Sequence, residues 1–255
     1  MNTAPINGFL ETEILNNIAT VTFGHPAGNS FPTALLTRLT SEINVLSHDE
    51  KVAVIVLKSQ GDGVFCGGAS FDELLQIATL EQGTAFFSQF ANVINAIRKC
   101  VKPVICRVQG KAVGGGVGLI AACDYVMATK NAAVKLSELA IGIGPFVIAP
   151  AVARKIGATA LAEMSWAAHE WKDAQWANQK GLFAQVFDSI ETLDNAVLLF
   201  SQKLASYNPE ALTAMKKVLW QDTDHWDNLL YERAQISGKL VLSDFTKNAL
   251  IAFKK

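Results

Sequence analysis

The chain has 255 residues, half of them apolar, which suffices for one large domain or for a domain with an appendage. Its 22 basic and 23 acidic residues leave a formal charge of -1, a balance that favours neither nucleic-acid binding nor a polybasic membrane contact. Residues 1–20 carry no signal pattern, and no uncharged apolar run reaches the roughly 18 residues of a transmembrane helix. We therefore expect a cytoplasmic protein.

Side chains that often carry chemistry are few and scattered. The four cysteines form no C-x-x-C pair, and we expect them to be buried thiols in a reducing compartment: Cys66, Cys100, Cys106 and Cys123. The histidines, none in a triad-like context, are His25, His48, His169 and His225. There is no G-x-S-x-G motif, which argues against a hydrolase, and no spacing of His, Cys and acidic residues predicts a metal.

The first half of the chain alternates strand and helix patterns. The turn pair Asn16-Asn17 separates two short strands, and Pro32 suits the first turn of a helix. In chain order we expect two strands within residues 9–23, a helix over 35–46, a buried strand over 51–57, and helices over 71–78 and 84–101. Pro103 ends the last of these.

The second half begins with strands and ends with helices alone. We expect strands over 104–108, 124–128, 132–136 and 182–187, and helices over 146–155, 158–167 and 171–178. Further helices are expected over 192–206, 209–220, 224–239 and 243–253. The recurrent unit of strand, turn and helix favours an α/β architecture with right-handed crossovers. The helical tail has little polar chemistry and is typical of a packing or oligomerisation element.

Two glycine-rich turns stand out. Gly114, Gly115 and Gly116 lie where the strand 104–108 leads into an apolar helix, so no side chain covers the unpaired N–H groups of its first turn. Such donors and the positive end of the helix favour an anion or a developing oxyanion. A second glycine turn spans Phe65–Phe71. We interpret the two turns as supplying one N–H group each to the same carbonyl oxygen.

Several motifs occur in an order and spacing that identify a family. They are His25-Pro with Asn29, Phe65-Cys-Gly-Gly-Ala69, Lys102-Pro-Val-Ile leading to Gly116, Ala121-Ala-Cys-Asp124 and Ala252-Phe-Lys254. Together they resemble the crotonase superfamily, the enoyl-CoA hydratase/isomerase family, over almost the whole chain. The resemblance implies a spiral of ββα units over residues 1–190 and a C-terminal helical trimerisation region over 191–255. It also implies a homotrimer or a dimer of trimers.

The resemblance also implies a substrate and a site. The substrate would be an acyl-CoA thioester, with coenzyme A as part of the substrate and no separate cofactor. The N–H groups of Ala69 and Gly115 would hold the thioester oxygen. Residues expected to line the acyl-CoA site are Ala27, Asn29, Phe31, Gly67, Gly68, Ser70, Phe71, Gly114 and Gly118. Phe86, Phe87 and Phe146 are further pocket candidates, although core positions are the commoner role of such residues. Lys247, Lys254 and Lys255 could meet the CoA phosphates or simply end a solvated helix.

The acid–base residues depart from the family pattern. The hydratases of the family use two glutamates; Glu138 matches one of them, whereas Gly118 stands at the position of the other. Ser70 likewise replaces an aspartate of the first turn. Leu136, Leu139 and Ile141 flank Glu138, and burial among them would raise the pKa of its carboxyl group toward neutrality.

One carboxylate suits a double-bond shift better than water addition. Moving a double bond from C3–C4 to C2–C3 takes a proton from C2 and returns one to C4, and Glu138 could do both. The alternatives are an enoyl-CoA hydratase and a non-catalytic acyl-CoA binder. A dinucleotide site at Gly116-Val-Gly-Leu-Ile-Ala121 is a weaker alternative, because its glycines lie too far beyond the strand. Gly118→Glu is expected to raise hydration if only the second carboxylate is missing.

Overall fold

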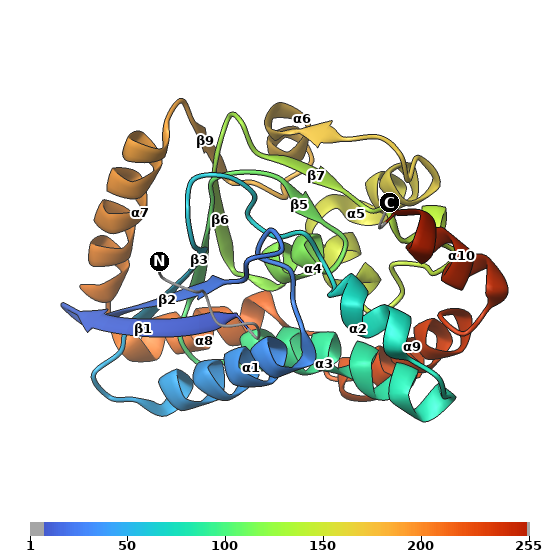
Figure 1. Ribbon diagram of the computed structural model, residues 1–255. Helices are drawn as coiled ribbons and strands as arrows, with labels where there is room; N and C mark the ends of the chain where they lie inside the picture. Colours follow the sequence, from blue (N-terminus) through green and yellow to red (C-terminus); the bar gives the residue numbers. More distant parts are fainter. Residues whose placement is uncertain (1–7, 254–255) are drawn as a thin grey trace, which may run out of the picture.

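The computed structural model describes residues 8–253, which form two sheets wrapped by helices (Figure 1). The larger sheet has the strand order β1-β2-β3-β4-β6-β9. Its strands are β1 (Phe9–Leu15), β2 (Ile18–Gly24), β3 (Val54–Ser59), β4 (Val104–Val108), β6 (Tyr125–Thr129) and β9 (Gln185–Phe187). Only β1 runs antiparallel to its neighbour; the other pairs are parallel. The smaller sheet joins β5 (Ala112–Val113), β7 (Ala133–Lys135) and β8 (Lys172–Asp173).

Both faces of the larger sheet are buried, as continuous apolar strands require. On one face, alternate side chains of β2, β3 and β4 pack with the helices α1 (Thr33–His48) and α3 (Leu80–Lys99). On the other face, Ile18, Val54 and Ile105 pack against Leu193 and Val197 of α7 (Ile190–Ala205). Figure 1 shows α7 lying along this face. A helix of the C-terminal tail therefore completes the core of the sheet.

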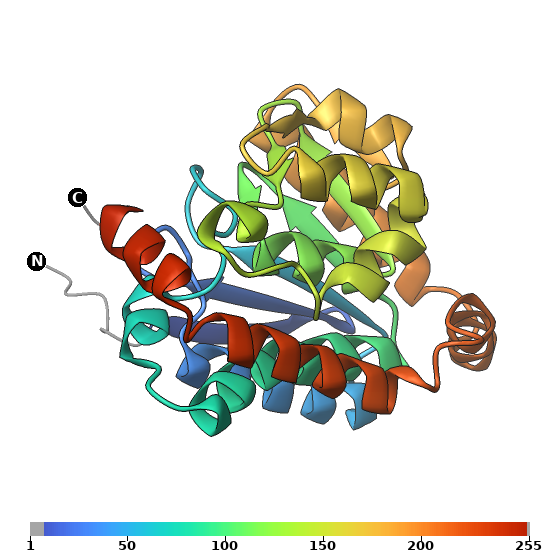
Figure 2. The same cartoon turned by 90° about the vertical axis from the view of Figure 1, so that its right-hand side faces the viewer.

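Eight further helical segments complete the described part of the chain. They are α2 (Phe71–Gln76), α4 (Gly115–Ala122), the 3-10 turn η1 (Glu138–Ile141), α5 (Ala149–Trp166), α6 (Ala174–Gln179), α8 (Pro209–Leu219), α9 (Trp226–Leu240) and α10 (Asp244–Phe253). Gly157 has a non-helical φ of 79° and breaks α5 into two segments, as the sequence predicts. In Figure 2, α9 lies along α3, α10 continues toward α2, and α8 lies at the edge of the molecule, where Lys216 pairs with Asp124.

The architecture confirms the predicted α/β fold with C-terminal helices, and some element boundaries differ. The helix expected from residue 84 begins at Leu80, because Thr79 and Gln82 form a capping box. The helix expected from 171 begins at Ala174, because Lys172 and Asp173 pair with β7 instead. The last strand is shorter than expected and covers only 185–187. The proposed boundary at residue 190 stays a prediction.

Candidate active site

The two glycine-rich turns lie side by side, joined by backbone hydrogen bonds. The N–H of Val113 donates to the carbonyl of Cys66 at 2.9 Å, and the N–H of Phe65 donates to the carbonyl of Lys111 at 2.9 Å. A Cβ atom on Gly116 would lie only 2.7 Å from the Cβ of Cys66, so glycine is needed where the turns touch. The two turns that sequence analysis paired therefore lie next to each other, and their shared use by a carbonyl oxygen stays a prediction.

Ala69 and Gly115 present their N–H groups to one cavity. The N–H of Phe31 donates to Gly68 and the N–H of Ser70 donates to Phe31, a parallel bridge that turns the N–H of Ala69 to its opposite side. Gly115 is the first residue of α4, where an N–H group has no intrahelical acceptor. Within residues 8–253 neither amide donates a hydrogen bond, and both residues line the same cavity. Two unpaired donors are thus available to one ligand.

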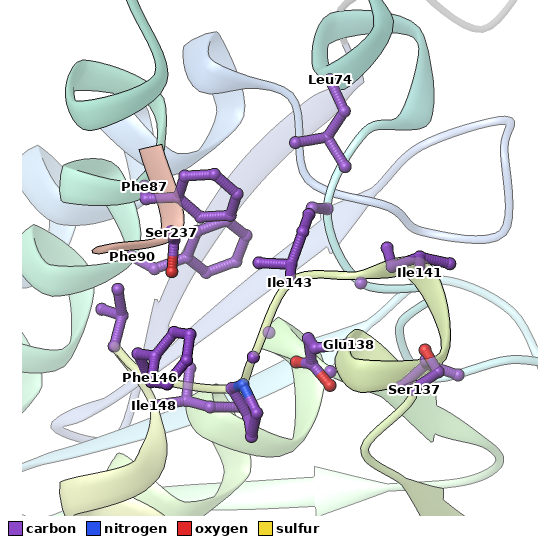
Figure 3. A pocket seen from close by; sticks show the side chains of 18 of the residues that line it. Leu74, Phe87, Phe90, Ser137, Glu138, Ile141, Ile143, Phe146, Ile148 and Ser237 are labelled. Atoms are coloured by element: carbon purple, nitrogen blue, oxygen red, sulfur yellow. The ribbon is translucent and has the colours of Figure 1, made fainter. Parts of the chain in front are cut away.

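Glu138 lies directly beside these donors. A Cβ atom on Gly114, whose φ is +52°, would fall 2.7 Å from Oε1 of Glu138, so the carboxyl group occupies the space that a side chain would fill. Oε2 of Glu138 is buried and has no hydrogen-bond partner among the described residues. Figure 3 shows the carboxyl group among the cavity-lining residues. Burial raises the pKa of Glu138 to about 7, which is the direction predicted from its apolar neighbours.

The cavity is almost wholly apolar beyond Glu138. Its walls come from both glycine turns, from residues 137–148, and from α2, α3 and α9. The large apolar side chains around it are Leu74, Phe87, Phe90, Ile141, Ile143, Phe146 and Ile148 (Figure 3). Glu138 is the one acidic residue of this lining, and no lysine, arginine or histidine lines it within the described residues. The site therefore combines two oxyanion donors with a single acid–base group.

Gly118 lies beneath Ile148 and is not among the residues of the cavity lining. A Cβ atom on Gly118 would meet Cγ2 of Ile148 at 2.3 Å and its Cβ at 2.6 Å. Ile148 is 4% exposed and takes the adjacent place in the cavity wall. The expectation that Gly118 lines the site is therefore corrected, and the condition for a gain from Gly118→Glu is not met, because Ile148 fills the space that a glutamate would need.

The other predicted binding residues fall into two groups. Gly67, Gly68, Phe71 and Gly114 line the cavity, as do Phe87 and Phe146. The residues Ala27, Asn29, Phe31, Ser70 and Phe86 lie outside the lining. Of these, Asn29 donates to the carbonyls of Gln60 and Val64, Phe31 is fully buried, and Ser70 caps α2. Asn29, Phe31 and Ser70 thus support the first turn and do not line the cavity, and Phe86 packs against Phe87 and Phe90. Lys254 and Lys255 lie outside the described residues.

Among the lining residues that sequence analysis did not predict are Phe90, Ile148 and Ser237. Each comes from a different helix or loop, and no local motif marks them. The described residues contain no cluster of three His, Cys, Asp or Glu that could hold a metal ion. Nor does any described helix have the length and apolarity to cross a membrane.

Two unpaired backbone N–H groups that face one cavity are the arrangement by which enzymes acting on acyl compounds stabilise a developing oxyanion. The model of the enoyl-CoA hydratase/isomerase family matches residues 13–254, and the chain belongs to this family. It is 32% identical over 209 residues to the 2,3-dehydroadipyl-CoA hydratase of Escherichia coli (strain K12), covering 80% of this chain and 78% of that protein.

Relatives of both reaction types are similar to this chain. The peroxisomal Delta(3,5)-Delta(2,4)-dienoyl-CoA isomerase of Arabidopsis thaliana is 29% identical over 192 residues, or 69% of this chain and 67% of that protein. The crystal structure of an enoyl-CoA hydratase from Bacillus halodurans superposes with a TM-score of 0.89 at 20% identity, over 96% of this chain and 99% of that one. The protein is an enzyme of the crotonase superfamily, with hydratases and isomerases among its relatives.

Proposed function

We propose that this enzyme shifts the double bond of an enoyl-CoA thioester from C3–C4 to C2–C3. The observation that carries the proposal is the single carboxyl group of the cavity, Glu138, beside a wall where Gly118 and Ile148 leave no room for another. A double-bond shift needs one group that takes a proton and returns it. Glu138, with a pKa near 7, is partly ionised at neutral pH and can do both.

The proposed reaction has two proton transfers. The carboxylate of Glu138 takes a proton from C2, and the electrons of that C–H bond move onto the thioester oxygen. The N–H groups of Ala69 and Gly115 donate to this oxygen, and the loss of one such donor typically costs about 3–4 kcal/mol of transition-state stabilisation. The enolate then collapses, C4 takes the proton back from Glu138, and the double bond lies between C2 and C3.

Water addition to a 2-enoyl-CoA is the alternative. It requires one group to activate water and another to protonate C2, and a general acid or base contributes roughly 10²–10⁴ in rate. The place next to Gly118 holds the apolar side chain of Ile148, which can neither orient nor deprotonate water. Since nothing in the described lining replaces the missing group, we propose isomerisation as the faster reaction.

Assembly is part of the same proposal. The family resemblance implies a homotrimer or a dimer of trimers, and the tail helices present apolar side chains on the surface. On α7 and α8, the large apolar side chains that are about half exposed are Leu198, Leu199, Met215, Val218 and Leu219. A second copy of this chain is the partner we propose for this surface.

A paired assay on 3-enoyl-CoA and 2-enoyl-CoA thioesters tests the proposed reaction. We expect the wild-type enzyme to isomerise the first faster than it hydrates the second. Glu138→Gln should lower isomerisation by at least about 10²-fold, because the amide cannot exchange a proton with carbon. Hydration faster than isomerisation, or full activity of the variant, would contradict the proposal.

A further inference from the structure

The cavity contains a second buried polar group that the proposed reaction does not use. Ser237 of α9 is 1% exposed and lines the cavity. Figure 3 shows this hydroxyl pointing into the space between Phe90 and Phe146. A hydroxyl that faces an apolar cavity can form a hydrogen bond with a polar atom of a ligand there, and such a bond adds affinity.

Ser237 lies at the closed end of the cavity. Phe87 and Phe90 beside it are 9% and 6% exposed, whereas Phe71 near the oxyanion donors is 36% exposed. A thioester that places its carbonyl oxygen at Ala69 and Gly115 must leave its bulky CoA part on the solvent side. The acyl chain then extends past Glu138 toward Ser237.

The position of Ser237 is fixed by a close crossing of two helices. A Cβ atom on Gly83 of α3 would lie 2.7 Å from the carbonyl oxygen of Gly238, and one on Gly238 would lie 2.5 Å from the N atom of Thr84. This contact holds α9 against α3 and leaves no passage between them at this point. The hydroxyl of Ser237 is therefore a hydrogen-bonding group in a fixed position at the end of the apolar cavity.

We propose that Ser237 recognises a neutral oxygen, such as a hydroxyl or a keto group, on the distal part of the acyl chain. This inference relies on the acyl-CoA class of substrate in the proposed function and adds to it the chemistry of the acyl group. A distal carboxylate fits poorly, because the described lining contains no cation to pair with it. The nearest guanidinium of α9, on Arg233, donates instead to the carbonyl of Phe146, and Arg233 lies outside the lining.

Calorimetric titration with saturated acyl-CoA thioesters tests the inference, since these ligands cannot react. The probes are thioesters of four, six and eight carbons, each unsubstituted, with a distal hydroxyl, with a distal keto group, or with a distal carboxylate. We expect the wild type to bind one of the hydroxy or keto thioesters about five- to tenfold more tightly than its unsubstituted counterpart. Ser237→Ala should abolish that preference and leave the unsubstituted affinity within about twofold.

Ser201→Ala is the matched control. Ser201 is likewise a buried serine, and its hydroxyl has no hydrogen-bond partner among the described residues, but it lies on α7, outside the cavity, so its replacement should leave the preference intact. If Ser237→Ala does not fold, Ser237→Thr, which keeps the hydroxyl, and Ser237→Gly give the same comparison. A wild type without preference, an unchanged preference in the Ser237 variants, or tightest binding of a carboxylate would overturn the inference. The titration measures binding and not turnover, so its outcome does not depend on whether the enzyme proves to be an isomerase.

Discussion

Glu138 holds its carboxyl group where the charged form is disfavoured. The group has an ordinary pKa of 4.5 in the unfolded chain and about 7 in the folded protein, so the folded state binds its proton more tightly. Its stabilising contribution is therefore complete below pH 4.5 and is lost as the pH rises through 7. A carboxyl group with a pKa near neutrality suits a residue that takes up and returns a proton, whereas binding of an acyl-CoA does not require one.

Replacing this carboxyl group should stabilise the protein at high pH. The Glu138→Gln side chain does not titrate. The unfolding free energy of the variant minus that of the wild type should therefore rise by about 3 kcal/mol between pH 4.5 and pH 8. Urea unfolding of both proteins at several pH values measures the difference. A difference independent of pH would mean that burial does not raise the pKa of Glu138.

Gly118 and Ile148 should be coupled energetically. Gly118→Ala places a Cβ atom within 2.3 Å of Ile148, and such overpacking typically costs about 1–3 kcal/mol. In an Ile148→Gly background the same change should cost much less, because both clashing atoms are gone. A double-mutant cycle of unfolding free energies should give a coupling of about 1–3 kcal/mol. Additive effects would show that Ile148 does not fill the space over Gly118.

At the residue scale, local motifs predicted some of the site and missed the rest. Ala69, Gly115 and Glu138 lie in glycine turns or in a short loop with a recognisable pattern, and the structure brings them to one cavity. Ile148 and Ser237 belong to no such pattern. Their roles arise from the way separate elements pack, which one sequence does not encode locally.

At the scale of elements, the turn that carries Glu138 is held by the C-terminal helix. Gly142 ends η1 with a φ of 80°, and α10 packs against it. A Cβ atom on Gly142 would lie 2.5 Å from Cδ1 of Phe245 and 2.7 Å from Oγ1 of Thr246. The contact between α10 and Gly142 therefore helps to position Glu138.

Gly142→Ala should therefore lower both stability and activity. A side chain there is strained by the positive φ and by the contact with α10, for an expected loss of about 2–3 kcal/mol and a clear fall in turnover. Gly157→Ala is the control, because Gly157 has a similar φ of 79° with no atom within 4 Å of the added Cβ. It should cost about 1 kcal/mol and leave turnover unchanged. Equal losses of stability and turnover in the two variants would show that the contact between Gly142 and α10 does not position Glu138.

The elements themselves were predictable where the pattern was long. The buried strands β3 and β4 and the helices α1 and α3 follow from apolar runs and helical spacing. The two-residue strands β5 and β8 do not, since their pairing partners in β7 come from distant parts of the chain. Short strands carry too few residues for a period to show.

At the scale of the molecule, the C-terminal helices serve several purposes. α7 covers the sheet, α9 closes the cavity, and α10 contacts η1, while α8 stands at the edge (Figure 2). The family resemblance anticipated a helical assembly region, but the closure of the cavity by α9 came only from packing.

The proposed assembly should be detectable from the molecular mass of the protein in solution. Sedimentation should give three or six times 27.5 kDa, and Leu199→Asp with Val218→Asp should shift the mass toward 27.5 kDa by placing charge in the contact. Val45→Asp, at a side chain of α1 that is 60% exposed, should leave the mass unchanged. A wild type that sediments as a monomer would contradict the assembly.

The transfer of deuterium within the substrate tests the single-carboxylate account most directly. A 3-enoyl-CoA carrying two deuterium atoms at C2 is converted in ordinary water, and the product is examined by mass spectrometry and NMR. If Glu138 alone moves the proton inside a water-poor cavity, a measurable share of product carries one deuterium at C4. Product with hydrogen from solvent alone at C4 would contradict the account, because the proton at C4 would then come from solvent exchange or from a second group and not directly from C2 through a shielded Glu138.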